Sequence, residues 1–221
     1  MAADAYNDKV ARAVRRLRRA DPRFIPVIEA AGPCGLVSEP RETLFFALGK
    51  AIVYQQLSGK AAATIFARVC GLFPGSSRGF TPARVLATAD EALRGAGLSR
   101  NKLLSLRDLA GRIESGELPG LAALRRQEDE QVVSALITVR GIGRWTAEMF
   151  LMFKLSRLDV LAVDDLGLRQ GYAILAGTGS EASREQLALA GEQWRPFRSV
   201  ASWYLWRAVE VHRRQAQHAQ Q

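Results

Sequence analysis

The chain has 221 residues, of which 48% are hydrophobic and 24% are charged, and this composition excludes a largely disordered protein. Its 31 basic residues exceed its 22 acidic residues, so the formal net charge is +9 and the pI is near 10.2. This balance favours a polyanionic partner such as nucleic acid, although many proteins are basic for no specific reason.

Helical periodicity begins at the N-terminus, over residues 6–20. Apolar residues recur there at helical spacing, and a run of arginines occupies the other faces. We interpret this basic face as solvated rather than as a DNA contact, because charge runs near a terminus are usually solvated. Asp21 and Pro22 are expected to end this helix.

The rest of the chain predicts more helices and no strand. One helix is expected from Ser38–Pro40 to about Gln55, and Thr88 with Glu91 resembles a capping box that opens a short helix ending at Gly95. Further segments with apolar residues at helical spacing are 61–73, 99–115, 129–138, 146–155, 166–175 and 199–213. The predicted fold class is therefore all-α.

The two cysteines, Cys34 and Cys70, lie far apart in the sequence and lack the spacing of a metal site. They therefore cannot build a zinc site or an iron–sulfur cluster. No apolar run has the length of a signal peptide core or of a bilayer span. We expect a cytoplasmic monomer with no membrane partner, associated with the nucleoid if its source is bacterial.

A turn of sequence Gly-Ile-Gly between two predicted helices is the most informative segment. It occupies Gly141–Gly143 within residues 136–147, and the second helix begins directly after it. Glycines permit close approach of another chain, and exposed amides at a helix start can hold a phosphate. The pattern is typical of a helix-hairpin-helix motif, and a simple turn between two core helices is the alternative.

The segment 163–169, which follows this hairpin, contains the Asp164-Asp165 pair. Together the two segments resemble the HhH-GPD superfamily of DNA glycosylases, in which the hairpin precedes an aspartate by about two helical turns and a loop. Residues 54–58 and 194–199 look like motifs of its alkylpurine branch, the 3-methyladenine DNA glycosylase II type. The resemblance extends over about residues 21–213.

The resemblance implies a single glycosylase unit over residues 1–221, with two helical lobes and the active site in the cleft between them. The expected lobes are residues 38–155, which include the hairpin, and residues 1–37 with 156–213, followed by a polar tail at 214–221. It also implies a monofunctional enzyme of base excision repair. Such an enzyme flips alkylated purines such as 3-methyladenine out of duplex DNA and hydrolyses the N-glycosidic bond.

By this resemblance Asp165 is the catalytic carboxylate, which stabilises positive charge on the sugar and orients water. Helix capping is the alternative role for Asp165, and one residue could do both. Asp164 is the competing choice for the catalytic position. Strand-cleaving relatives carry a lysine where this chain has Trp145, so no lyase activity is expected.

An N-alkylated purine is cationic, so aromatic faces would bind the flipped base. Trp145 is the leading pocket candidate, and Trp206 is assigned to packing. The lower-ranked pocket candidates, aromatic residues that core packing explains more often, are Tyr54, Phe197 and Trp203. Met149 stands where some members of the branch present an aromatic ring, which leaves the lesion range open.

Leu57 is the candidate wedge that fills the space left by the flipped base, with Gln56 as its neighbour and a core position for Leu57 as the alternative. Arg140 stands where many family members carry proline. The candidate DNA contacts are Gln56, Leu57, Ser58, Lys60, Gly141, Gly143, Arg144, Thr146 and Arg198. A solvated surface explains the three basic residues among them equally well.

No cofactor is expected to be required. The resemblance implies a monovalent cation, Na⁺ or K⁺, bound by the backbone carbonyls of Ile137, Val139 and Ile142. The expected partner is duplex DNA containing alkylated bases. The alternatives are a glycosylase of the same superfamily for another damaged or mismatched base, a non-enzymatic helix-hairpin-helix protein that only holds DNA, and a basic helical scaffold that binds proteins.

Overall fold

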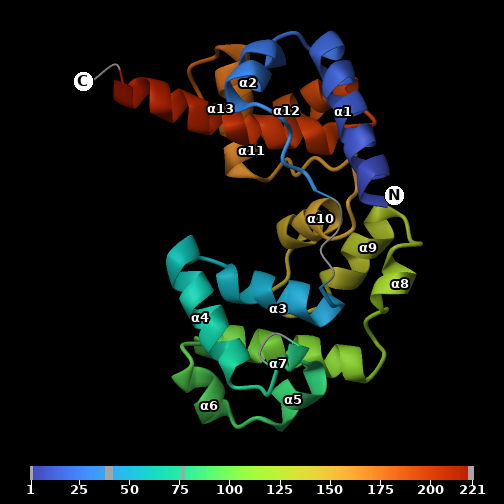
Figure 1. Cartoon of the computed structure of the whole chain (residues 1–221), viewed down its shortest axis with the longest axis vertical. Coiled ribbons are helices and arrows are strands. Elements are labelled where there is room, and N and C mark those ends of the chain that lie inside the picture. Colours follow the sequence, from blue (N-terminus) through green and yellow to red (C-terminus); the bar gives the residue numbers. More distant parts are fainter. Residues whose placement is uncertain (1, 38–41, 76–77, 219–221) are drawn as a thin grey trace. The chain divides into compact units, whose positions relative to one another are not determined.

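The computed structural model describes residues 2–37, 42–75 and 78–218, and these form helices and no β-strand (Figure 1). The prediction of an all-α fold is confirmed. The α-helices are α1 (Ala2–Ala20), α2 (Phe24–Ala31), α3 (Leu44–Tyr54), α4 (Gly59–Gly71), α5 (Pro82–Ala87), α6 (Asp90–Gly95), α7 (Arg100–Glu114), α8 (Leu121–Leu124), α9 (Asp129–Leu136), α10 (Arg144–Phe153), α11 (Leu166–Ala176), α12 (Arg184–Gly191) and α13 (Arg198–His218), with a 3-10 helix η2 (Glu192–Trp194). None of the described helices combines the length and apolar character of a bilayer span.

Hydroxyl caps fix the beginnings of several helices. Ser58 accepts a hydrogen bond from the Ala61 amide at the start of α4, and Ser99 accepts one at the start of α7. The predicted capping box at Thr88 is wrong. Its hydroxyl donates to the Arg84 carbonyl at 2.8 Å, because α5 precedes it and α6 begins only at Asp90.

Two further predicted boundaries differ from the structure. The predicted helix start at Ser38–Pro40 lies outside the described residues, and α3 begins at Leu44 with Thr43 as its cap. The helix predicted over residues 199–213 ends too early, because α13 continues to His218. Four short helices, α2, α5, α8 and α12, are absent from the sequence predictions, since a helix of about two turns carries little periodic signal.

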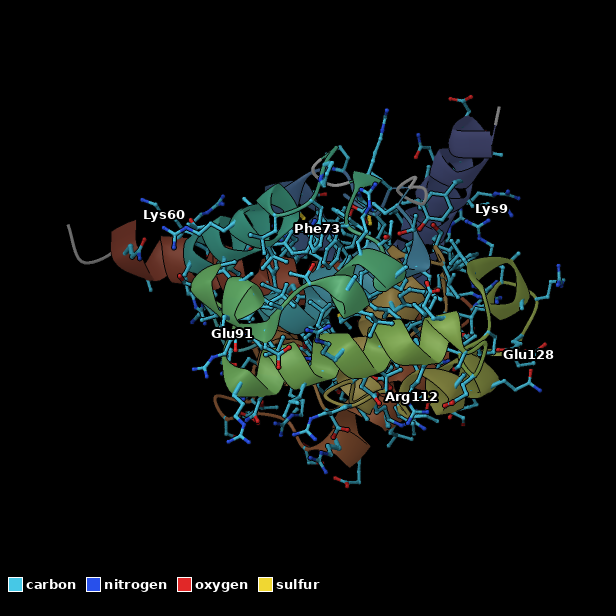
Figure 2. The ribbon with its side chains drawn as sticks, turned by 90° about the horizontal axis from the view of Figure 1, so that it is seen from below. Lys9, Lys60, Phe73, Glu91, Arg112 and Glu128 are labelled. Carbon is cyan, nitrogen blue, oxygen red and sulfur yellow. The ribbon has the colours of Figure 1, made fainter. Side chains whose placement is uncertain are left out.

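Contacts divide the chain into two compact units. We call residues 40–150 the central unit, and residues 1–39 with 151–221 the terminal unit. In the central unit α7 packs against α3 and α5, and α3 packs against α4. Its core contains Phe80, which is 2% exposed and is surrounded by the rings of Phe45, Phe46 and Phe73. In Figure 2 the labelled Arg112 marks α7 in this unit.

The terminal unit is built around α13, which contacts α11, α2 and α1 (Figure 1). At Gly171 the backbone of α11 approaches α13 so closely that a Cβ atom would overlap the Leu205 carbonyl. The buried Asp21 accepts a hydrogen bond from the Trp194 indole at 3.1 Å and pairs with Arg23. Burial alone would raise the pKa of Asp21, but these hydrogen bonds hold it below its ordinary value.

Candidate active site

Asp165 lies at the start of α11 in the terminal unit, where it caps the helix. Its Oδ1 atom accepts hydrogen bonds from the Leu168 amide at 2.8 Å and from the Trp206 indole nitrogen at 3.0 Å. The residue is only 9% exposed. Two donors from segments far apart in the sequence therefore fix the orientation of a buried carboxylate, and the helix N-terminus favours negative charge there.

Trp206 also contributes an aromatic surface beside this carboxylate. Its ring stacks on Phe153 with centroids 6.0 Å apart and planes 23° apart, and Phe153 is 46% exposed. Gly167 leaves room for this arrangement, because a Cβ there would lie 3.0 Å from the Trp206 ring. The assignment of Trp206 to packing is incomplete: its ring packs against Phe153, but its indole N–H also binds Asp165, and helical spacing does not show whether an indole N–H has a polar partner.

The two neighbouring aspartates, Asp164 and Asp165, have different surroundings. Asp164 is exposed and forms an ion pair with Arg184, whereas Asp165 is buried and hydrogen-bonded as a cap. An exposed, paired carboxylate has its charge compensated and screened by water. The geometry therefore favours Asp165 over Asp164 as the reactive carboxylate.

Residues 194–199, one of the two motifs of the sequence resemblance, hold the loop that precedes Asp165. Asp159 accepts hydrogen bonds from Arg195 and from Arg198, both at 2.8 Å. The Ser199 hydroxyl accepts a hydrogen bond from the Val160 amide at 3.0 Å. Arg198 is only 18% exposed in this pairing, which argues against its predicted contact with phosphate. These residues instead fasten the loop before α11 to the start of α13.

Two other pocket candidates lie elsewhere in the terminal unit. Phe197 lines a cavity of about 440 Å³ with basic residues of α1, among them Lys9. It directly precedes α13, and Trp206 lies eight residues after Arg198, about 12 Å along that helix at 1.5 Å per residue. The ring of Trp203 packs edge-on against Tyr204 and lies under the Arg207 guanidinium. The structure therefore does not bring Phe197 or Trp203 to Asp165, although it does bring Trp206 there.

The glycine hairpin of the central unit connects α9 to α10 through a closed turn. The Ile142 amide donates to the Val139 carbonyl at 3.0 Å, and Gly141 has a positive φ of 78°. A side chain at Gly141 would collide with the Ser105 hydroxyl, whereas Gly143 is exposed and a Cβ there would meet nothing within 4 Å. The start of α10 is thus an exposed backbone surface of the kind that binds phosphate.

Side chains around the hairpin have more definite partners than the sequence indicates. Arg144 forms two hydrogen bonds with Glu130, at 2.7 and 3.0 Å, and holds the pKa of that carboxyl below its ordinary value. This pairing argues against the predicted phosphate contact of Arg144. Thr146 is buried, Trp145 is 45% exposed, and Met149 is half-buried one turn later.

The candidate wedge lies in the turn after α3. Gln56 has a positive φ of 56°, and Leu57 is 38% exposed, so the core alternative for Leu57 is wrong. Tyr54 is half-buried and packs edge-on against Phe66, as expected of a core residue. The Lys60 side chain projects outward at the beginning of α4 (Figure 2). We call residues 55–58 the wedge turn.

Metal ligands do not gather in the described part of the chain: no three side chains of His, Cys, Asp or Glu there could hold one ion. Cys34 and Cys70 are free thiols, and burial raises the pKa of Cys34 to about 11. The sequence reasoning missed Phe153 and the hydrogen-bonding role of Trp206. No sequence signal pairs Trp206 with Asp165, which lies 41 residues before it.

Residues 50–196 match the family model described as HhH-GPD superfamily base excision DNA repair protein. The chain belongs to this family, as its sequence resemblance predicts.

Relatives of known structure and known name share this fold. DNA-3-methyladenine glycosylase 1 of Schizosaccharomyces pombe is 36% identical over 178 residues, which cover 78% of this chain and 74% of that protein. A solved complex of the fission yeast 3-methyladenine DNA glycosylase with abasic DNA has a TM-score of 0.80 and 31% identity, covering 88% of this chain and 95% of that one. DNA-3-methyladenine glycosidase from Bacillus halodurans has a TM-score of 0.79 and 40% identity, covering 89% and 88%.

Proposed function

We propose that this protein is a monofunctional DNA glycosylase that removes alkylated purines, 3-methyladenine among them, from duplex DNA during base excision repair. The observation that carries the proposal is the Asp165 carboxylate, oriented by Leu168 and Trp206 beside the stacked pair of Trp206 and the exposed Phe153. Relatives named as 3-methyladenine glycosylases support the substrate class. The abasic DNA bound by the fission yeast enzyme is the product that such a reaction leaves.

The reaction breaks the bond between the sugar C1′ atom and the purine nitrogen. The bonding electrons leave with the base, for which an N-alkylated, cationic purine is well suited, and positive charge develops on the sugar. The Asp165 carboxylate stabilises this charge and orients the water that adds to C1′ and loses a proton. Because Trp145 replaces the lysine of strand-cleaving relatives, the chain offers water rather than an amine as acceptor at that position.

The flipped base needs a surface that favours a cationic ring. The stacked pair Phe153 and Trp206 offers one beside Asp165, and cation–π attraction would contribute roughly 0.5–2 kcal/mol. Trp145, which is exposed on α10, remains a second candidate for this contact. Cationic lesions such as 3-methyladenine and 7-methylguanine should therefore be released faster than the neutral lesions hypoxanthine and ethenoadenine.

The central unit supplies the DNA contacts in this proposal. Amides at the hairpin bind phosphate, and the exposed Leu57 enters the base stack after the nucleotide is extruded. The carbonyls of Ile137, Val139 and Ile142 would hold a monovalent cation, since Ile137 caps the C-terminus of α9, where carbonyls lack helical partners. The Val139 carbonyl already accepts the Ile142 amide and retains a second lone pair. When bound, the cation would add positive charge near the phosphate.

Duplex DNA is the partner that this function requires, and the proposed location is therefore with the chromosome. In a bacterial cell this is the nucleoid within the cytoplasm. The net charge of +9 is consistent with such a partner.

One incubation with a methylated duplex tests the proposal. The protein should release free alkylpurine, leave an intact abasic strand until alkali is added, and form no covalent complex on borohydride treatment. A trapped complex or a strand break before alkali would contradict the monofunctional mechanism. Retention of methylated bases with ordinary DNA binding would instead favour a protein that only holds DNA.

A further inference from the structure

Helix α7 carries three polar side chains at intervals of three residues, Lys102, Ser105 and Asp108. They face two turns of the central unit for which the proposed function requires an accurate position: the wedge turn and the hairpin. Neither lysine nor aspartate is expected on the inner side of a helix without a partner. Both Lys102 and Asp108 have hydrogen-bonding partners in these turns.

Lys102 holds the wedge turn. Its Nζ atom donates to the Val53 carbonyl at 2.6 Å and to the Gln55 carbonyl at 2.7 Å. These carbonyls lie at the end of α3, where helical acceptors lack amide partners and a positive charge is favourable. Burial lowers the pKa of the Lys102 ammonium. The contact therefore fixes the backbone from which Leu57 projects.

Asp108 and Ser105 hold the hairpin. The Asp108 carboxylate accepts a hydrogen bond from the Arg140 amide at 2.7 Å and is itself held by Arg112 at 3.1 Å. Ser105 is buried, and its hydroxyl occupies the space where a Gly141 side chain would lie. The turn is thus positioned from α7 by one hydrogen bond and one close contact.

A third connection joins the two turns directly. The Gln55 side-chain amide donates to the Gly141 carbonyl at 2.8 Å and to the Thr146 hydroxyl at 3.5 Å. Lys102 holds the backbone of the same residue. The wedge turn, the hairpin and α7 therefore form a closed set of contacts within the central unit.

We propose that Lys102, Gln55 and Asp108 are positioning residues that hold the wedge turn and the hairpin at one fixed spacing, so that the phosphate bound by the hairpin determines where Leu57 enters the base stack. This inference rests on the proposed function. Extruding a paired nucleotide breaks its pairing and stacking, and a preorganised wedge offsets that cost only if it reaches the gap without being reordered. The contribution is therefore specific to the extrusion step.

Excision from two duplexes tests this role. One carries the alkylated base fully paired, and the other carries it in an unpaired bulge, where extrusion is nearly free. Lys102→Met should slow single-turnover excision from the paired duplex at least tenfold and excision from the bulge less than threefold. Lys102→Arg should restore most of the difference, because a guanidinium can donate to both carbonyls. Lys9→Met, which removes a positive charge from α1, is the matched control and should release the alkylated base from both duplexes at the wild-type rate.

The outcomes separate failure of this role from failure of the proposed function. If the wild type releases no alkylated base from either duplex, the proposed function fails. If the wild type is active and Lys102→Met slows both duplexes equally, Lys102 is merely structural and the positioning role is wrong.

A second variant keeps the test decisive if Lys102→Met does not fold. Gln55→Leu removes the bonds to Gly141 and Thr146 but keeps the Lys102 contact, which uses the Gln55 backbone. It should show the same selective loss on the paired duplex. Fluorescence of 2-aminopurine beside the lesion should rise less with Gln55→Leu than with the wild type, and an equal rise would overturn the proposal.

Discussion

The surroundings of Asp165 and the glycine hairpin differ in what they expose. Asp165 is 9% exposed, and side chains from α13 and the loop before α11 fix its position. At the hairpin, Gly143 is exposed, and the surface it offers is backbone. The proposed reactive charge is thus buried and held by named partners, whereas the hairpin, the proposed DNA contact, depends on main-chain shape.

This difference indicates how each region should respond to substitution. Around Asp165, changing one atom type should alter the reaction while leaving DNA affinity intact, because in the proposed mechanism the carboxylate acts on charge that develops only in the transition state. At the hairpin, changing side-chain bulk should alter affinity for every duplex alike, because phosphate contacts carry no sequence information.

The variant Asp165→Asn should show the largest effect on the reaction. Asparagine keeps the shape and the capping ability of Asp165 but loses the negative charge, so we expect excision to fall by at least about a thousandfold while DNA affinity stays within about twofold. Rates of base release and binding titrations measure the two effects. Asp164→Asn is the matched control and should remain near wild type. Near-normal excision by Asp165→Asn would remove this carboxylate from the mechanism.

The variant Trp206→Phe also tests the surroundings of Asp165. It keeps an aromatic ring against Phe153 but removes the indole N–H that binds Asp165. We expect kcat to fall by about ten- to a hundredfold, the loss typical when a group that orients a functional side chain is removed. Single-turnover kinetics on a methylated duplex checks it. A variant with unchanged kcat would show that the indole hydrogen bond is not needed to orient the carboxylate.

Gly143→Val tests the opposite side. Bulk at the exposed helix start should weaken binding to damaged and undamaged duplexes equally, by about five- to tenfold, since each lost backbone contact to phosphate is worth about 1 kcal/mol. Titrations at two salt concentrations measure this. Unchanged affinity in a folded variant would remove the hairpin from DNA binding.

The smallest effect concerns stability and pH in the terminal unit. Because Arg23 and Trp194 hold the pKa of Asp21 below its unfolded value, the stabilisation by Asp21 is present at neutral pH and is lost as pH falls below about 4. Asp21→Asn should lower the free energy of unfolding at pH 7 by about 1–3 kcal/mol. Urea unfolding from pH 7 to pH 3 should show the two proteins converging, and a constant difference would contradict the linkage.

Sequence patterns predicted the features that depend on residues close together in the sequence. Helical periodicity indicated the all-α fold, and the Gly-Ile-Gly turn followed by Asp165 indicated the family. The start of α11 could be placed because capping needs only a side chain and the next turn of helix. The cleft between two lobes stays a prediction.

Contacts between distant segments were not predictable in the same way. Trp203 and Trp206 lie three residues apart on one helix, so helical spacing does not distinguish their roles. Only the structure shows which indole binds Asp165. Arg198 was expected at phosphate because an isolated arginine in a motif carries no sign of its carboxylate partner, here Asp159. A sequence shows charge, and the pairing of charges is a tertiary property.

The bond between Asp21 and Trp194 joins residues 173 positions apart, so both ends of the chain are needed to complete the terminal unit. During synthesis on the ribosome, every residue of the central unit emerges before Asp165 does, and the Trp206 indole emerges later still. A translation product that ends before Trp206 would therefore contain the whole hairpin and Asp165 but would lack the indole that binds this carboxylate. Under the proposed function, such a fragment would keep the candidate DNA contacts of the central unit and would lose one of the groups that orient the carboxylate needed for base release.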